Sequence, residues 1–380
     1  MSHIYIESDE FARGLEQDLS NADRIALDCE AAGFHRYSDR LCLMQITIED
    51  RTYIVDPLGF DPTALVRGPL EDPDVEILMH GADFDLRLLS RDLGVRLRGL
   101  TDTQVYASLA GEEALGLQSL LESRLGVKLS KKYQRADWAQ RPLSESMLEY
   151  AAEDTRHLHR LTEKLEADLE RLGRTPWARE ECRALEAVAD EPEDEDPVDP
   201  VTRIKGARDL SPRQVTALRE ALEWRDEIAR ERDRAPFRVV GERPLTDAVA
   251  KKPRRVEELL DIRGFPKALA RSDGKELIRR LHAVTQMSDD ELEPYPPSER
   301  RGSGRPPPEV EARFRRLKEI RNREAAKLDL PRGILLANAV LTEIARASPE
   351  TRDELLAVEG MRSWKADVLG DALLSEVARG

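Results

Sequence analysis

The chain has 380 residues, a length that fits two or three domains. Charged residues make up 36% of it and aromatic residues only 5%, and no apolar run is long enough to span a bilayer. Membrane proteins and unfolded chains are therefore excluded. The N-terminal residues lack the basic and apolar regions of a secretory signal. We expect a cytoplasmic, helix-rich protein with no membrane partner and no obligatory protein partner.

The charge is distributed unevenly along the chain. The net charge is −15, yet residues 1–200 carry about −20 and residues 201–380 about +5. An acidic front half joined to a mildly basic half is compatible with a metal-dependent enzyme that acts on a phosphate-rich substrate. Ordinary solvated surface charge is the alternative explanation.

Short apolar runs near the N-terminus predict strands, and longer periodic runs predict helices. A helix is expected around residues 84–92, and Ser144 is a plausible N-cap for a long helix that carries Tyr150, Asp154 and Leu158. Strands that alternate with helices favour a mixed sheet flanked by helices. The four expected strands cover residues 24–28, 41–48, 52–56 and 76–80.

Two breaks and an internal repeat organise the rest of the chain. The acidic, proline-containing run 191–200 predicts an extended linker, and the Pro/Gly/Ser-rich stretch 294–308 predicts a second. Between and beyond them, residues 224–265 align without gaps on residues 320–361, an offset of 96 that pairs Arg225 with Arg321 and Gly264 with Gly360. Two copies of one all-helical module are therefore expected.

The three cysteines, Cys29, Cys42 and Cys182, are odd in number and lack the close spacing of zinc or redox sites. We interpret them as reduced thiols.

Asp28 and Glu30 end an apolar strand. Side chains two residues apart in a strand point to the same face, so both carboxylates can reach one cation. A surface turn explains most isolated pairs of this kind. Here the pair directly follows residues 25–27, at the strand's C-terminal end, where α/β sheets usually bind ligands.

Asp85 follows the predicted strand that ends at His80. It lies at the start of the next helix and can point back toward the strand ends. The alternative role, an acid that stabilises the helix N-terminus, suits Asp83 better.

Tyr150 and Asp154 are four residues apart in the predicted long helix, so both lie on one helical face. Small Ala151 and Ala152 allow that helix to approach its neighbours closely. A core tyrosine beside a solvated aspartate is the alternative.

Four converging carboxylates with no histidine or cysteine cluster suit a hard cation such as Mg²⁺ or Mn²⁺. Two such ions can clamp an in-line displacement at a phosphodiester. In that arrangement Tyr150 orients the attacking water, since a phenol with a reference pKa near 10 is a poor base.

These residues resemble a known set in order and approximate spacing. Asp28-x-Glu30, Asp85 and Tyr150-x-x-x-Asp154 look like motifs I, II and III of the DEDDy exonucleases. Three further segments resemble the ribonuclease D family in particular, and the repeated modules look like tandem HRDC domains. These segments are Val55-Asp56-Pro57-Leu58, Asp102-Thr103-Gln104 and Arg135-Ala136-Asp137-Trp138 through Arg141-Pro142-Leu143.

The resemblance implies a fold, an activity and a set of domains. The fold is an α/β RNase H-like exonuclease domain followed by two all-α HRDC-like bundles. The activity is metal-dependent removal of nucleotides from RNA 3′ ends, notably tRNA precursors. The implied domains are an exonuclease domain (1–188), an acidic linker (189–206), an HRDC-like domain (207–288), a Pro/Gly/Ser-rich linker (289–306) and a second HRDC-like domain (307–380).

Trp138 and Arg141 are further candidates for substrate binding. An aromatic ring can stack on a base and a guanidinium can bind phosphate. A packed tryptophan and a surface arginine are the alternatives.

Two other functions compete with an exoribonuclease that uses two ions of Mg²⁺ or Mn²⁺ per site. The first is a 3′-5′ exonuclease for single-stranded DNA, because carboxylate-metal chemistry does not distinguish the sugars. The second is a non-catalytic nucleic-acid-binding adaptor that works through the helical pair.

Overall fold

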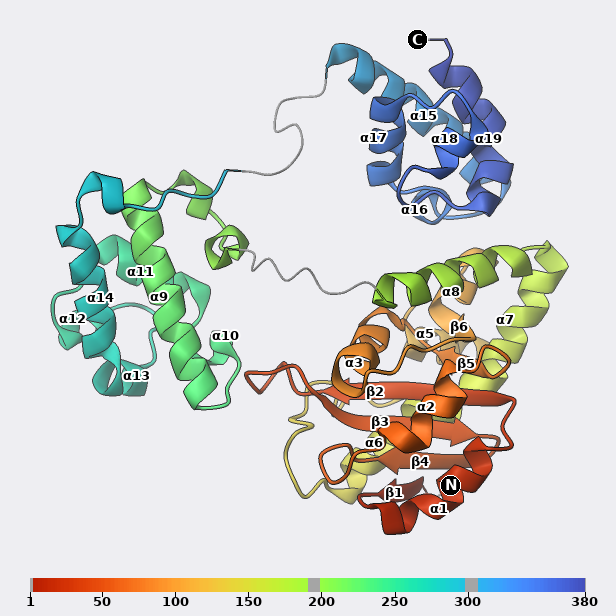
Figure 1. Ribbon diagram of the computed structural model, residues 1–380, viewed down its shortest axis with the longest axis horizontal. Coiled ribbons are helices and arrows are strands. Elements are labelled where there is room, and N and C mark those ends of the chain that lie inside the picture. Colours follow the sequence, from red (N-terminus) through yellow and green to blue (C-terminus); the bar gives the residue numbers. More distant parts are fainter. Residues whose placement is uncertain (1–2, 191–198, 298–306, 380) are drawn as a thin grey trace.

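The computed structural model describes residues 3–190, 199–297 and 307–379. It contains an α/β unit followed by two helical bundles (Figure 1). The described chain thus has the predicted order of one mixed-sheet domain and two all-helical modules. Most of the predicted linker 191–200 and the middle of the predicted linker 294–308 lie outside the described residues.

Six strands form one mixed sheet in the order β1-β4-β3-β2-β5-β6. The antiparallel pairs are β2 with β3 and β3 with β4, and the other three pairs are parallel. The strands are β1 (His3–Ile6), β2 (Arg24–Ala31), β3 (Leu41–Ile48), β4 (Arg51–Val55), β5 (Glu76–Met79) and β6 (Leu100–Asp102).

All four predicted strands are present, and two short ones were not predicted. Every residue of β3 is buried, which explains why its sequence is a nearly continuous apolar run. The additional strands, β1 and β6, have four and three residues and lie at the two edges of the sheet. Runs this short carry too little alternation to be recognised, and only pairing with a neighbour makes them strands.

Eight helices surround this sheet. They are α1 (Asp9–Leu19), α2 (Thr63–Glu71), α3 (Asp83–Leu93), α4 (Thr103–Ala110), α5 (Leu117–Leu125), α6 (Glu145–Arg156), α7 (Leu158–Leu172) and α8 (Thr175–Asp190). The predicted helix 84–92 is α3, and Ser144 is the N-cap residue of α6. The prediction of one helix from Ser144 through Leu158 was wrong at its end, because the chain leaves the helix at His157 and Leu158 begins α7.

The two bundles repeat each other. In the first are α9 (Pro212–Glu231), α10 (Pro236–Val239), α11 (Glu242–Lys251), α12 (Val256–Leu260), α13 (Lys267–Ser272) and α14 (Gly274–Gln286); in the second are α15 (Pro308–Lys327), α16 (Arg332–Leu335), α17 (Asn338–Ala347), α18 (Arg352–Leu356) and α19 (Ser363–Val377).

The first four helices of each bundle begin and end 96 residues apart, as the predicted repeat requires. The turn glycines Gly264 and Gly360 have φ of 85° and 81°, which explains why both copies keep glycine there. The copies differ at their ends, where α19 replaces the pair α13 and α14.

Segments assigned from the sequence to the linkers are partly built into the first bundle. Residues 200–203 form a short 3-10 helix whose Val201 is fully buried. Arg219 on α9 binds Asp199 at 2.6 Å and the backbone oxygen of Glu293 at 2.6 Å. The described residues on both sides of this bundle therefore pack against α9 instead of forming the ends of free linkers.

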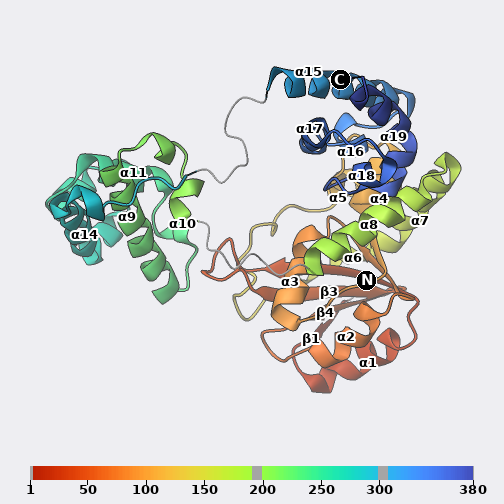
Figure 2. The same cartoon turned by 45° about the horizontal axis from the view of Figure 1, so that its top comes forward.

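The second bundle packs against α8 in both views (Figures 1 and 2). Trp177 of α8 stacks on Trp364 of α19 with ring centroids 4.7 Å apart, and Glu181 accepts a 2.8 Å hydrogen bond from the Trp364 indole. Lys365 also pairs with Glu181 at 2.7 Å.

The three cysteines are buried and free, as expected. Within the described ranges, no helix combines the length and apolar character needed to cross a membrane.

Candidate active site

Strand β2 places two carboxylates on one face of the sheet. Asp28 lies opposite Gln45 in the antiparallel register with β3, and Glu30 lies opposite Leu43. The pairing shifts directly after Glu30, between Glu30 and Ala31, so Glu30 is the last residue before the irregularity. Such an irregularity changes the direction of the strand and re-aims the neighbouring side chains.

Helix α6 covers the same face and brings in the third carboxylate. Ala151 and Ala152 are fully buried, and Thr155 hydrogen-bonds to Thr47 of β3 at 2.8 Å. The small side chains let the helix lie close to the sheet, which brings Asp154 next to β2. Tyr150 lies one turn earlier on this helix.

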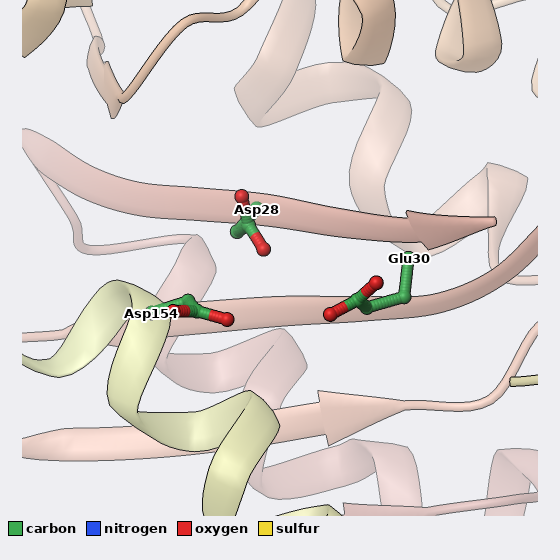
Figure 3. A group of neighbouring side chains, drawn as sticks. All are labelled: Asp28, Glu30 and Asp154. Atoms are coloured by element: carbon green, nitrogen blue, oxygen red, sulfur yellow. The ribbon is translucent and has the colours of Figure 1, made fainter. Parts of the chain in front are cut away.

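The structure brings Asp28, Glu30 and Asp154 together. Oxygen atoms from the three carboxylates lie within 4.8 Å of one another. Figure 3 shows the side chains of Asp28 and Glu30 on β2 and of Asp154 on α6 pointing into the same space. Side chains 124 residues apart in the sequence therefore share one site.

Asp85 lies in the first turn of α3 and is buried, but it is not part of that 4.8 Å group. Its charge still reaches the cluster, because it raises the pKa values of Asp28, Cys29 and Glu30. Asp83, the alternative helix-start acid, forms an ion pair with Arg87 on the surface of the same helix.

Asp102 organises the turn that carries Asp85. Its carboxylate accepts hydrogen bonds from the backbone of Gly81 at 3.0 Å and Ala82 at 2.8 Å. It also caps α4 by accepting from Gln104 at 2.7 Å. One buried carboxylate thus fixes the starts of α3 and α4 relative to each other. This role of Asp102 was not predicted from the sequence.

Burial and nearby negative charges raise the pKa of all four acids. The pKa of Asp28 is raised mainly by burial and then by the charge of Asp85. The pKa of Glu30 is raised mainly by burial and then by the charge of Asp28. The pKa of Asp85 rises to about 7, through burial and then the charge of Asp102. The pKa of Asp154 rises to about 8, through burial and then the charges of Asp28 and Glu153.

The donor set fits divalent metal ions. In the part of the chain that the structure describes, no lysine, arginine or histidine forms an ion pair with any of the four acids. Grouped carboxylates that lack a cationic partner are costly unless they are protonated or hold a cation. The donors are all oxygen atoms, which suits Mg²⁺ or Mn²⁺ better than the softer metals.

Tyr150 is held between aromatic neighbours beside the acids. Its ring lies 6.1 Å from that of Trp138 in a stacked arrangement and 5.8 Å from that of Tyr133 in an edge-on one. Burial, and then the charges of Asp154, Glu30 and Asp28, raise the pKa of its hydroxyl. The phenol therefore stays protonated and serves as a hydrogen-bonding group.

Trp138 and Arg141 have structural partners. Trp138 is only 2% exposed and packs in a small core with Leu43, Leu148 and Ala152. Arg141 pairs with Asp56 through two 2.6 Å hydrogen bonds and donates to the backbone oxygen of Cys42 at 2.9 Å. The position of Trp138 favours the packed tryptophan given above as the alternative. Arg141 is instead a partly buried arginine paired with Asp56, which differs from the surface arginine given as its alternative.

Gln45 is a neighbour of the site that the sequence analysis did not select. It is fully buried, and when its amide is oriented so that both its atoms have partners, the nitrogen donates to the backbone oxygen of Asp28 at 2.8 Å and to its carboxylate at 3.3 Å. The available signal was a glutamine inside an otherwise apolar strand, since a buried amide requires a partner.

A pocket of about 370 Å³ adjoins the acids. Tyr150 and Asp154 line it on the side of α6, and Lys128 and Lys132 line it from the preceding loop. Glu149 and Glu153 line it as well, so ammonium and carboxylate groups stand side by side in this pocket.

Comparisons with known proteins agree with this architecture. The sequence profile of a family described as "3′-5′ exonuclease" matches residues 3–170, and that of the HRDC domain matches residues 214–281 and 310–377. A protein named Ribonuclease D from Pseudomonas paraeruginosa is 31% identical over 92% of this chain and 91% of its own length. Ribonuclease D from Escherichia coli is 32% identical over 77% of each chain.

A solved structure agrees as well. The crystal structure of Escherichia coli RNase D, described as an exoribonuclease involved in structured RNA processing, superposes with a TM-score of 0.70 at 26% identity. The superposition covers 100% of this chain and 99% of the other.

The fold, the acid cluster and the matched profile define a 3′-5′ exonuclease of a metal-dependent class. The chain belongs to the ribonuclease D family, and it is a 3′-5′ exoribonuclease that carries two HRDC domains. The predicted family, fold class and enzyme type are thus confirmed. The domain boundaries and the roles of individual site residues stay predictions.

Proposed function

We propose that this enzyme removes nucleotides one at a time from the 3′ ends of RNA, with tRNA precursors as its substrate class. The observation that carries the proposal is the meeting of Asp28, Glu30 and Asp154 within 4.8 Å, with no cationic partner among the described residues. RNA as the polymer is supported by the names of the relatives, and tRNA precursors by the resemblance of the motifs.

The four acids would hold two divalent ions, Mg²⁺ or Mn²⁺. Such ions lower the pKa of the attacking water and stabilise charge on the phosphoryl and leaving oxygens. Asp28 and Glu30 provide oxygens from β2, Asp154 provides them from α6, and Asp85 approaches from α3. Gln45 holds the carboxylate of Asp28 in place.

Tyr150 would position the attacking water. Its hydroxyl lies on the helical face of Asp154 and stays protonated at neutral pH, so it can donate a hydrogen bond but cannot remove a proton. The packing of its ring between Trp138 and Tyr133 fixes the direction of the hydroxyl.

The lysine-lined pocket supports a nucleic-acid substrate. Lys128 and Lys132 place positive charge beside Asp154 where a phosphate would approach, and Lys128 is also paired with Glu122 at 3.2 Å. The cytoplasmic location and the absence of an obligatory protein partner stay predictions from the sequence.

The test is digestion of a 3′-extended tRNA in Mg²⁺. We expect shortening from the 3′ end in single-nucleotide steps, and loss of this activity in Asp28→Asn. Asp50→Asn, an exposed acid in the β3–β4 turn, is the matched control and should retain full activity. Full activity of Asp28→Asn would refute the assigned site.

Two further measurements test the competing functions. Equal or faster digestion of single-stranded DNA would favour the DNA exonuclease. Intact RNA binding by a protein that binds no Mg²⁺ in a calorimetric titration would favour the adaptor.

A further inference from the structure

The loop between β2 and β3 joins the active site to the first bundle. It begins after Ala31, the residue that follows Glu30 at the end of β2, and in both views it reaches toward α10 (Figures 1 and 2). Tyr37 donates to Asp226 of α9 at 2.9 Å, and the backbone nitrogen of Ala235 donates to the backbone oxygen of His35 at 3.1 Å. The first bundle is thereby held beside the strand that carries two of the acids.

Two phenylalanines meet at this junction and remain exposed. The rings of Phe34 in the loop and Phe237 in α10 have centroids 5.4 Å apart, yet they are 40% and 51% exposed. A contact that served only to join two domains would bury its aromatic rings. These rings instead present a shared apolar surface to solvent.

Two arginines flank the rings. The Arg238 guanidinium lies 4.7 Å from the centroid of Phe34, and that of Arg135 lies 5.6 Å from it. Arg238 also donates to the backbone oxygen of Phe34 at 2.7 Å. Neither arginine forms an ion pair with a carboxylate in residues 3–190, 199–297 and 307–379, so both positive charges remain available to an anion.

The internal repeat shows that these residues are not required by the helical module itself. The residues 96 positions after Phe237 and Arg238 are Gly333 and Ile334. The second bundle therefore folds the equivalent helix, α16, with neither an aromatic ring nor a cation at these two positions. The pair occurs only in the copy that touches the active-site loop.

We propose that Phe34 and Phe237, with Arg135 and Arg238, form a stacking platform for single-stranded RNA on its way to the carboxylates. Exposed aromatic rings accept bases of any sequence, and neighbouring guanidinium groups bind the phosphates between them. Phe34 is four residues from Glu30, so their Cα atoms are at most about 14 Å apart. The platform rests on the proposed function and specifies where the 3′ strand lies before the cleaved bond.

Binding is measured by fluorescence anisotropy with a labelled single-stranded RNA, in an Asp28→Asn background that leaves the RNA intact. Phe34→Leu and Phe237→Leu keep an apolar side chain and remove the aromatic face. We expect each to weaken RNA binding by about tenfold. Phe11→Leu, at a 57% exposed phenylalanine of α1, is the matched control and should bind as the parent does.

The role of the two arginines is tested by the salt dependence of RNA binding. Replacing both Arg135 and Arg238 by Gln removes two phosphate contacts, so the salt dependence of log K for single-stranded RNA should become shallower by about 1.4. An unchanged slope in the double variant would contradict the role assigned to the two guanidinium groups.

Three outcomes overturn the platform. Unchanged affinity in Phe34→Leu and Phe237→Leu is the first, and equal weakening in Phe11→Leu is the second. The third is weaker binding by these two variants together with a larger radius of gyration in small-angle scattering. The rings would then serve to hold the first bundle against the α/β unit. RNA shortening by the unmodified enzyme is recorded separately, so failure of the platform leaves the proposed function standing.

Discussion

At the scale of single residues, the site depends on acids kept in an unfavourable environment. Asp28, Glu30 and Asp154 are crowded by one another and Asp85 lies near Asp102, and none of the four has a cationic partner among the described residues. Their raised pKa values mean that, without metal, protons neutralise part of the cluster near neutral pH. Metal ions and protons therefore compete for the same oxygens.

This competition predicts a pH-dependent stability. The folded pKa values of about 7 for Asp85 and about 8 for Asp154 lie above the ordinary value of 3.8. Proton binding by these two carboxyl groups favours the folded state. Its contribution to the free energy of unfolding is complete below about pH 4 and is lost as pH rises through 7 and 8. In EDTA we expect the melting temperature to fall between pH 6 and pH 8.5. Added Mg²⁺ should raise it more at pH 8.5 than at pH 6.

Calorimetric melting of the full chain measures both effects. Asp154→Asn, which cannot titrate at that position, serves as the control and should show a smaller dependence on pH. A stabilisation by Mg²⁺ that is the same at both pH values would contradict the protonation argument.

At the scale of elements, α6 holds Asp154 and Tyr150 on one helical face. Its two buried alanines set its distance from the sheet, and one helical turn sets the spacing of Tyr150 and Asp154. The apolar side of the helix packs against the sheet and holds the helix in place. Its polar side is therefore free to carry Tyr150 and Asp154 at the site.

This arrangement predicts the effect of Tyr150→Phe. The ring keeps its contacts with Trp138 and Tyr133, so we expect the melting temperature to change little. The lost hydroxyl should lower kcat by about 10²-fold while KM for RNA stays nearly constant. An increase in KM with unchanged kcat would instead indicate a role in binding. Steady-state kinetics on a 3′-extended RNA distinguishes the two results.

At the scale of the whole molecule, the two bundles contact the catalytic unit differently. The first touches the active-site loop through residues 34–37, whereas the second packs on α8 through Trp177 and Trp364. The second bundle shares its buried core with the α/β unit, while the first has a core of its own. One copy thus lies beside the loop that follows β2, and the other shares its core with the α/β unit.

The packing on α8 predicts the effect of Trp177→Ala. Removal of this ring should cost about 3 kcal/mol of stability and loosen the second bundle from α8. We expect a lower melting temperature and a larger radius of gyration in small-angle scattering. Val188→Ala, at another side chain on α8 that is 39% exposed, should change neither quantity. An unchanged radius of gyration in Trp177→Ala would show that the bundle is held by its other contacts.

The sequence by itself determined the features that depend on local periodicity. Asp28 and Glu30 share a strand face because side chains alternate, and Tyr150 and Asp154 share a helix face because they are four residues apart. The 96-residue repeat is likewise visible in the sequence, because each copy needs the same helices and the same turn glycine.

Tertiary structure alone decided the features that depend on distant neighbours. β1 and β6 are too short to be strands without a partner strand. The roles of Gln45 and Asp102, the pairing of Arg141 with Asp56, and the meeting of Phe34 with Phe237 join residues far apart in the sequence. No local pattern encodes such contacts, because they exist only once packing of the sheet and helices has fixed which surfaces meet.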